Sequence, residues 1–116
     1  MSTEPDIAVV VIGRNEGARL VASLASLQGV VSRIVYVDSG STDNSLQVAR
    51  NAGAQVVELD MSVPFTAARA RNAGFAALDP APEFVQFIDG DCIVEPGWLA
   101  SGMDALAQSE DIGIVT

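Results

Sequence analysis

Two aspartates separated by one glycine, Asp89-Gly90-Asp91, directly follow an apolar run and are the first candidates for chemistry. Side chains two residues apart at the end of a strand fall on the same side, and Gly90 lets the backbone turn sharply. Carboxylates this close repel each other unless a proton or a cation lies between them. A hard divalent ion such as Mg²⁺ or Mn²⁺ satisfies such a pair and fills its shell with water and phosphate oxygens. The alternative is a turn with two solvated acids.

Two more polar loops follow apolar runs: Gly13-Arg14-Asn15-Glu16, and Asp38-Ser39-Gly40-Ser41-Thr42-Asp43. In the second loop, Gly40 permits a tight turn and Thr42 or Asp43 can cap a following helix. A turn with a helix cap explains residues 41–43 but leaves Asp38 unexplained. Its carboxylate ends an apolar run, where it can accept a hydrogen bond from a base N–H or a ribose hydroxyl.

A third candidate, Ala70-Arg71-Asn72-Ala73-Gly74, lies inside an alanine-rich helical pattern. At 100° per residue Arg69 and Arg71 point to nearly opposite faces, so at most one of them faces a shared site. A solvated arginine is the alternative. Asn72 and Gly74 both lower helix propensity, so small residues at this point indicate close packing on a sheet.

The elements that must position these residues alternate between strand and helix. Four runs rich in β-branched residues predict strands, and the first two are nearly continuous, as in strands buried on both faces: Ile7–Ile12, Arg33–Asp38, Gln55–Leu59 and Phe84–Asp89. Residues 111–115 begin a fifth. Helical patterns lie between them, at Leu20–Leu27, Ser45–Asn51, residues 66–78 and from Pro96 onward, with Leu99, Met103 and Leu106 as a stripe. We therefore expect an α/β fold with a mostly parallel, Rossmann-like sheet and helices on both faces, in which ligands bind outside the carboxyl ends of the strands.

Composition excludes several classes of protein. The 116 residues suit one domain, and a net charge of −9 disfavours nucleic acid and anionic membranes. Without histidine there is no Ser-His-Asp triad, Cys-His pair or imidazole metal ligand. All six bases are arginine, so there is no P-loop lysine, and we expect a bound cation together with a few local arginines to reverse the sign of the charge around a phosphorylated ligand. The single Cys92 excludes an internal disulfide. No targeting or transmembrane segment is visible, and we expect a cytoplasmic domain.

In order and spacing these motifs resemble the nucleotide-binding half of the inverting glycosyltransferases of family 2. The resemblance covers nearly the whole chain. It comprises the first strand with Asn15-Glu16, then Ile34-Val-Tyr-Val-Asp38-Ser-Gly-Ser-Thr-Asp43, then Ala70-Arg-Asn-Ala-Gly74, and lastly Phe87-Ile-Asp89-Gly-Asp91. Each motif alone is weak, whereas four in the same order are strong.

The resemblance implies a GT-A fold that binds a nucleoside diphosphate sugar, with a UDP-sugar favoured, through a divalent cation, Mg²⁺ or Mn²⁺. Residues 13–16 and 38–40 would line the nucleoside pocket, with Asp38 at the base. Arg71 would lie near the base and Asp89 near the ribose. Asp91, with Asp89, would bind the metal, which would stabilise charge on the leaving diphosphate.

The chain departs from the family pattern in two ways. Cys92 stands where many members carry a further acid, and the family's catalytic base lies in a second half that these motifs do not include. We therefore expect residues 1–116 to form one donor-binding domain that is truncated relative to a full catalytic domain, with an exposed sheet edge that favours a homo-oligomer. Glu95 and Asp104 are interpreted as surface residues. The alternatives are a nucleotidyltransferase of similar fold and a non-catalytic nucleotide-binding module.

Overall fold

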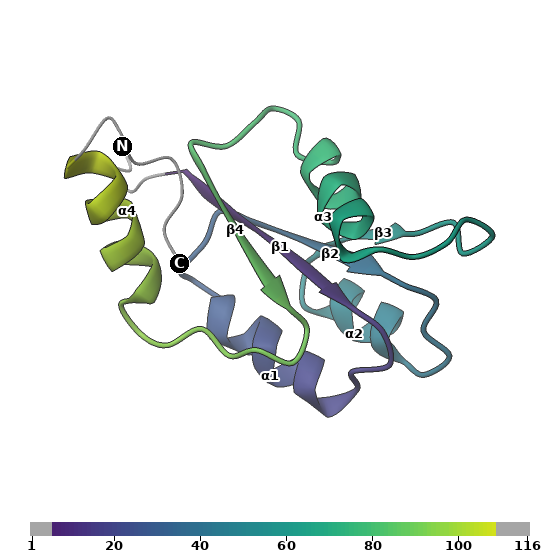
Figure 1. The fold of residues 1–116 in the computed structure, drawn as a ribbon. Helices are drawn as coiled ribbons and strands as arrows, with labels where there is room; N and C mark the ends of the chain where they lie inside the picture. Colours follow the sequence, from purple (N-terminus) through teal and green to yellow (C-terminus); the bar gives the residue numbers. More distant parts are fainter. Residues whose placement is uncertain (1–5, 109–116) are drawn as a thin grey trace.

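The computed structural model describes residues 6–108, which form one parallel sheet flanked by helices (Figure 1). The strands run in the order β3-β2-β1-β4, and every neighbouring pair is parallel. Their bounds are β1 Ile7–Gly13, β2 Arg33–Asp38, β3 Gln55–Glu58 and β4 Phe84–Asp89. All four strands expected from the sequence are present, with bounds that differ by at most one residue at an end. The expected fifth strand lies outside the described residues.

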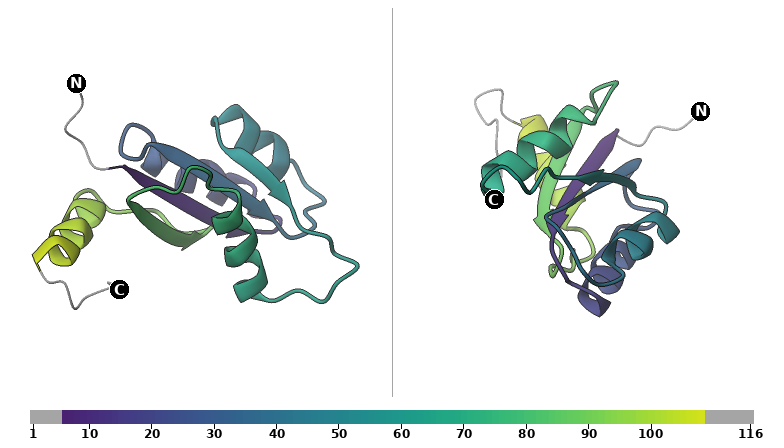
Figure 2. Two further views of the ribbon diagram at one scale, coloured as in Figure 1. Left: turned by 90° about the horizontal axis from the view of Figure 1, so that it is seen from above. Right: turned by 90° about the vertical axis from the view of Figure 1, so that its right-hand side faces the viewer.

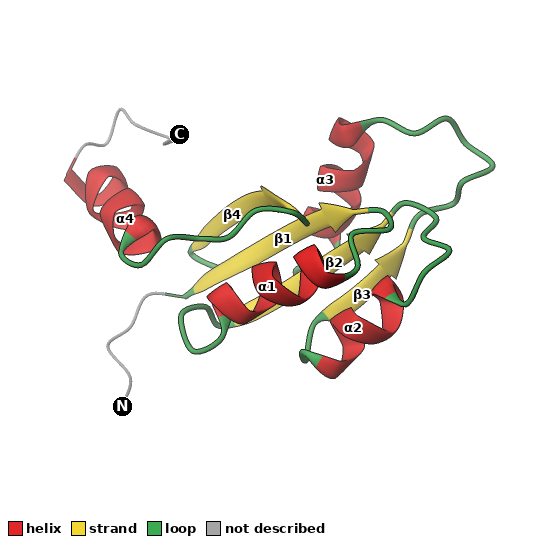
Figure 3. Ribbon diagram, turned by 90° about the horizontal axis from the view of Figure 1, so that it is seen from below, coloured by secondary structure: helices red, strands yellow, loops and turns green. Residues whose placement is uncertain are grey.

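Four helices connect or follow the strands: α1 Ala18–Leu27, α2 Ser45–Asn51, α3 Ala67–Ala76 and α4 Trp98–Gln108. Helices α1 and α2 lie on one face of the sheet and α3 on the other, whereas α4 lies apart from them beyond β4 (Figures 2 and 3). Thr66 caps α3 as expected, because its side chain accepts a hydrogen bond from the Arg69 backbone N–H. Helix α4 begins two residues after Pro96 rather than at it.

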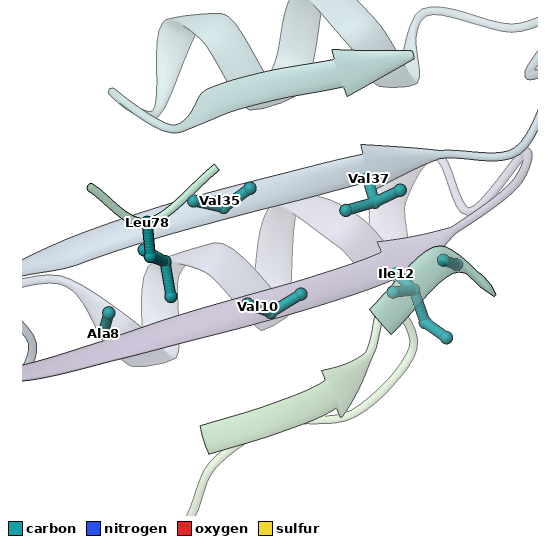
Figure 4. Close-up of a cluster of buried hydrophobic side chains, with 7 residues drawn as sticks. Ala8, Val10, Ile12, Val35, Val37 and Leu78 are labelled. Carbon is teal, nitrogen blue, oxygen red and sulfur yellow. The ribbon is translucent and has the colours of Figure 1, made fainter. Parts of the chain in front are cut away.

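The core has two layers, because β1 and β2 are buried on both faces. Val9 and Val11 face α1 and α2, where they pack with Leu20, Leu24 and Tyr36. On the opposite face, the side chains of Ala8, Val10, Ile12, Val35, Val37 and Leu78 lie together (Figure 4), and Ala70 of α3 belongs to the same cluster. A continuous apolar strand is what a parallel sheet covered on both faces requires.

Helix α3 lies very close to the sheet at Gly74. A methyl group placed there would overlap the Val10 side chain and come within 2.9 Å of Val37. Only glycine lets the helix backbone approach this closely. The close packing expected from Gly74 is thus confirmed, whereas Asn72 is exposed.

The order in which strands are added to the sheet reverses at β1. Strands β2 and β3 are added on one side of β1, and the chain then returns through α3 and adds β4 on the other side. Open parallel sheets bind ligands where the strand order reverses, outside the carboxyl ends. The loops after β1, β2 and β4 meet at this point. Among residues 6–108, no helix is both long and apolar enough to cross a bilayer.

Candidate functional site

A cavity of about 420 Å³ opens at the carboxyl ends of the strands, and we call it the first cavity. Six of the ten residues singled out from the sequence line it: Gly13, Arg14, Glu16, Ser39, Asp89 and Asp91. The others, Asn15, Asp38, Gly40 and Arg71, lie outside its wall. The fold therefore brings together loops that are more than 70 residues apart in the sequence. Six of the predicted residues line the cavity, and the other four lie outside its wall.

Glu16 occupies the centre of the wall, between the end of β1 and the end of β4. A methyl group at Gly13 or at Gly90 would lie 3.3 Å from the Glu16 Cγ, so both glycines leave room for this side chain. The Glu16 carboxylate accepts a hydrogen bond from the Arg19 Nε at 2.9 Å, one helical turn along. That contact restrains the Glu16 side chain in the wall of the first cavity.

Asn15 joins the loop after β1 to the loop after β2. Its side-chain oxygen accepts hydrogen bonds from the backbone N–H groups of Thr42, at 2.7 Å, and Asp43, at 3.2 Å. Its own backbone N–H donates to the Ser41 Oγ at 2.9 Å. Asn15 adopts a left-handed backbone with φ of 53°, which asparagine tolerates better than most residues. The side chain predicted to contact a ligand thus acts between the two loops.

Asp38 is buried at the end of β2, and its oxygens are taken up by the chain itself. They accept hydrogen bonds from the Tyr36 hydroxyl at 2.8 Å and from the backbone N–H groups of Gly40 and Ser41. The Ser41 hydroxyl also donates to it. Burial, followed by the hydrogen bond to Asp38, raises the pKa of Tyr36 far above its usual range. Asp38 therefore shapes the loop that presents the neighbouring Ser39 to the cavity.

The two carboxylates after β4 remain open to solvent. Asp89 and Asp91 both line the first cavity, and the Asp89 carboxylate lies 4.0 Å from the Arg71 guanidinium. Cys92 donates a weak hydrogen bond to Asp91 across 3.6 Å, and partial desolvation followed by this contact raises the pKa of the thiol. A neutral thiol is a poor ligand for a hard cation.

A divalent ion fits these acids only if other ligands complete its shell. Within residues 6–108, no group of three or more acidic or cysteine side chains is placed to hold a metal ion. Mg²⁺ commonly binds proteins through one or two carboxylates, with substrate phosphates and water as the other ligands. Asp89 and Asp91 match that donor set, so the site suits a cation that arrives together with a phosphorylated ligand.

A second cavity, of about 520 Å³, lies on the other side of Asp89 and contains Arg71, Phe87 and Trp98. The Trp98 indole N–H donates to the Gln86 side chain at 3.3 Å. Arg71 is thus placed next to Asp89 and outside the wall of the first cavity. Arg69 turns to the loop before α3, so the expected divergence of the two arginines is confirmed.

Met61 and Phe65, from the loop between β3 and α3, also line the first cavity, and neither was singled out from the sequence. Met61 lies against the Gly40 backbone, where a methyl group would be 3.1 Å from the Met61 Cγ. The available signal was the run of apolar residues in a loop, Met61, Val63 and Phe65, with no strand or helix to bury them.

Comparisons with known proteins agree with this geometry. The family model described as glycosyl transferase family 2 matches residues 8–116. A glycosyltransferase of Rickettsia felis is 35% identical over 51 residues, which is 44% of this chain and 18% of that protein. A TPR repeat-containing protein of Synechococcus elongatus is 31% identical over 85 residues, 73% of this chain and 20% of that protein.

Among solved structures, glucosyl-3-phosphoglycerate synthase from Mycobacterium tuberculosis, in complex with Mn²⁺, UDP and glucosyl-3-phosphoglycerate, is 29% identical with a TM-score of 0.75. The match covers 93% of this chain and 42% of the synthase chain. The same synthase with Mg²⁺ and UDP is 30% identical with a TM-score of 0.74, and the match covers 93% and 41% of the two chains. The chain therefore spans less than half of the solved relative and about a fifth of the curated ones. It shares the Rossmann-like GT-A fold of the synthase and belongs to glycosyl transferase family 2.

Proposed function

We propose that this chain is the donor-binding part of a glycosyltransferase. The first cavity holds a nucleoside diphosphate sugar, with a uridine nucleotide favoured, and Asp91 and Asp89 hold Mg²⁺ or Mn²⁺ against the diphosphate. The observation that carries the proposal is the convergence of the β1, β2 and β4 loops on one cavity with two open carboxylates at one end. The solved synthase, described with UDP-glucose and Mn²⁺, supports the same choice of ligand.

The charge of the chain gives the cation a necessary part in donor binding. With a net charge of −9, the protein repels a diphosphate, and among residues 6–108 Arg14 is the one basic side chain in the wall of the first cavity. A divalent ion held by Asp91 and Asp89 reverses the local sign. When bound, it would stabilise the negative charge that builds on the diphosphate as the bond from sugar to phosphate breaks.

Each wall residue has a role that follows from its position. Glu16 and Ser39 offer hydrogen-bond partners to the nucleoside, and the Arg71 guanidinium, 4.0 Å from Asp89, restrains that carboxylate. The proposal treats residues 1–116 as one donor-binding unit corresponding to part of the longer relatives. Glu95 and Asp104 are exposed and receive no role, and no residue of the chain is assigned as the base for the acceptor hydroxyl.

Titration calorimetry with UDP, with and without Mn²⁺, tests the proposal. We expect each ligand to bind much more tightly when the other is present, because neither the acids nor the phosphates alone complete the metal shell. Asp91→Asn should weaken joint binding by about tenfold or more, since it removes a charged ligand. Asp104→Asn, in the exposed face of α4, removes the same charge and should leave binding unchanged.

The products formed from two different sets of substrates separate the remaining alternatives. Release of the nucleoside diphosphate from a nucleotide sugar identifies a glycosyltransferase, and release of pyrophosphate from a nucleoside triphosphate and a sugar phosphate identifies a nucleotidyltransferase. Joint binding with no product from either reaction is the result expected both of a nucleotide-binding module and of a donor-binding part to which no catalytic base is assigned. Equal affinity of wild type and Asp91→Asn for UDP with Mn²⁺ would contradict the assignment of the metal ligands.

A further inference from the structure

The loop between β3 and α3, residues 59–66, exposes three large apolar side chains. Met61, Val63 and Phe65 are 41%, 45% and 47% exposed. Met61 and Phe65 line the first cavity, and Ala67 at the start of α3 continues that surface. We call Met61 and Phe65 the apolar wall. Exposed apolar side chains that border a cavity are a common sign of a ligand contact.

Arg69 holds this loop from the first turn of α3. Its guanidinium donates hydrogen bonds to the backbone carbonyl oxygens of Asp60, at 2.7 Å, and Val63, at 3.3 Å. The two carbonyl groups lie on either side of Met61, so one side chain spans the part of the loop that carries it. The planar guanidinium suits such a double contact, because its donors have fixed directions.

The Asp60 side chain adds a local turn to the same loop. Its carboxylate accepts from the Ser62 backbone N–H at 3.0 Å and from the Ser62 hydroxyl at 2.6 Å. These hydrogen bonds lower the pKa of Asp60. Thr66 closes the loop, because its hydroxyl oxygen accepts from the Arg69 backbone N–H at 3.0 Å. The loop therefore has a defined shape although it is exposed.

The first cavity is acidic at one end and apolar at the other. Asp89 and Asp91 lie at the end of β4, whereas Met61 packs on Gly40 beyond the end of β2. The two strands are separated by β1 alone, so the ends are roughly 10 Å apart at the usual strand spacing. A nucleoside diphosphate is arranged in the same way, with a charged diphosphate at one end and, at the other, an uncharged flat base whose faces can stack on apolar side chains.

We propose that Met61 and Phe65 form the surface against which the base of the bound nucleotide packs, and that Arg69 is the positioning residue that holds this surface in place. The inference rests on the function proposed above, because it assumes a nucleotide in the first cavity. It adds a recognition element from a loop that contains none of the motif residues.

Substitution of Phe65 in the apolar wall should weaken binding of the base and leave binding of the phosphates unchanged. With Mn²⁺ present, Phe65→Ser should weaken UDP binding by about tenfold, the loss expected when a base loses an aromatic partner. Binding of inorganic pyrophosphate with Mn²⁺ should not change. Phe65→Tyr keeps the ring and should retain the wild-type affinity for UDP. Phe65 is half exposed, so these variants should keep the thermal stability of the wild type.

Arg69→Ala tests the positioning role. It should weaken UDP binding to a similar extent and leave pyrophosphate binding unchanged, because the guanidinium contacts the loop and lies outside the cavity wall. The double variant with Phe65→Ser should be little weaker than either single variant, since both changes remove the same contact. Arg50→Ala is the matched control, because Arg50 makes only an exposed ion pair with Glu58 at 3.9 Å among the residues described.

The results separate the inference from the function on which it rests. If the wild type binds neither UDP nor pyrophosphate with Mn²⁺, both proposals are wrong. If the wild type binds UDP and the Phe65 and Arg69 variants bind it equally well, the role of the loop is wrong and the donor site stands. Additive losses in the double variant would overturn the coupling between Arg69 and the wall.

Discussion

At the scale of single residues, two of the predicted site residues, Asn15 and Asp38, make hydrogen bonds that hold loops of the site. Asn15 accepts hydrogen bonds from two backbone N–H groups of the neighbouring loop, and Asp38 accepts from three partners in its own loop and one in β2. Both are polar residues at the end of a strand, where a ligand contact is the usual interpretation. Neither of them lines the first cavity, whereas their neighbours Arg14 and Ser39 do, and their contact with a ligand stays a prediction.

Substitution of Asn15 should loosen the two loops and lower the affinity for UDP. Asn15→Gly keeps the left-handed backbone accessible and removes the acceptor oxygen, so it should cost about 1 kcal/mol in the free energy of unfolding. Asn15→Ala also strains the backbone and should cost about 1 kcal/mol more. Asn15→Asp retains an acceptor and serves as the control. Urea unfolding measures these differences, and equal stability of all three variants would contradict the role of Asn15.

Tyr36 should make the protein less stable at alkaline pH. Its pKa is raised in the folded state, so the unfolded chain loses the phenolic proton first as the pH rises above about 10. Below that pH both states are protonated and the contribution is fully present, whereas above it the free energy of unfolding falls with rising pH. The chain has one tyrosine, so the absorbance of tyrosinate reports this group alone.

The control for Tyr36 is Tyr36→Phe, whose stability should change less between pH 9 and pH 11, roughly the interval that spans the ordinary tyrosine pKa. A wild-type absorbance titration centred near the ordinary value would show that the hydroxyl is open to water, in conflict with its full burial.

At the scale of elements, the contact between α3 and the sheet sets the position of the loop that precedes the helix. The helix carries Thr66 and Arg69 at its start and Gly74 against Val10 and Val37. Its distance from the sheet therefore also fixes where Met61 and Phe65 lie. Helix α3 thus links the packing of Gly74 on the sheet to the position of Met61 and Phe65 in the cavity wall.

Gly74→Ala should destabilise the protein although alanine is the better helix former. The added methyl group would overlap Val10, and overpacking of this kind costs about 1–3 kcal/mol. Gly102→Ala in α4 is the matched control, since nothing lies within 4 Å of an added methyl group and the change should stabilise by up to about 1 kcal/mol. Thermal unfolding of the two variants should move in opposite directions, and a stabilised Gly74→Ala variant would contradict the close approach.

The elements were predictable from the sequence because their signals are local. Continuous β-branched runs gave β1 and β2 their two buried faces, and Thr66 marked the start of α3. Which polar side chains of the site line the cavity and which hold its loops was not predictable from the sequence. Tyr36 and Asp38 are two residues apart in β2, so their spacing places both side chains on one face of the sheet, but it does not say whether Asp38 accepts from the Tyr36 hydroxyl or from a ligand. The contact of Arg69 with the Asp60 carbonyl oxygen depends on how the loop before α3 folds back, and the residue spacing does not encode it.

At the scale of the whole molecule, β4 is an edge of the sheet formed by residues 6–108. Phe87, Ile93 and Trp98 are exposed beside that edge, at 38%, 63% and 46%. An unpaired edge with apolar neighbours offers a surface for another strand. The sequence-based expectation of a homo-oligomer stays a prediction, and this edge is the part of the described structure that supports it.

Self-association should appear as a mass that rises with protein concentration in analytical ultracentrifugation. Phe87→Glu adds a charge at the edge and should shift the distribution toward the monomer. Val21→Glu, on the outer face of α1, adds the same charge elsewhere and is the control. A wild-type mass that stays at 12.0 kDa across the concentration range would contradict the expectation.

The position of Trp98 has a practical consequence for every binding measurement proposed above. It is the chain's single tryptophan and shares the second cavity with Asp89, which also borders the first cavity. A ligand or ion that draws the Asp89 carboxylate toward the first cavity changes the charge next to the indole. The intrinsic fluorescence of Trp98 should therefore respond to occupation of the donor site without any attached label, and the molecule carries its own optical probe.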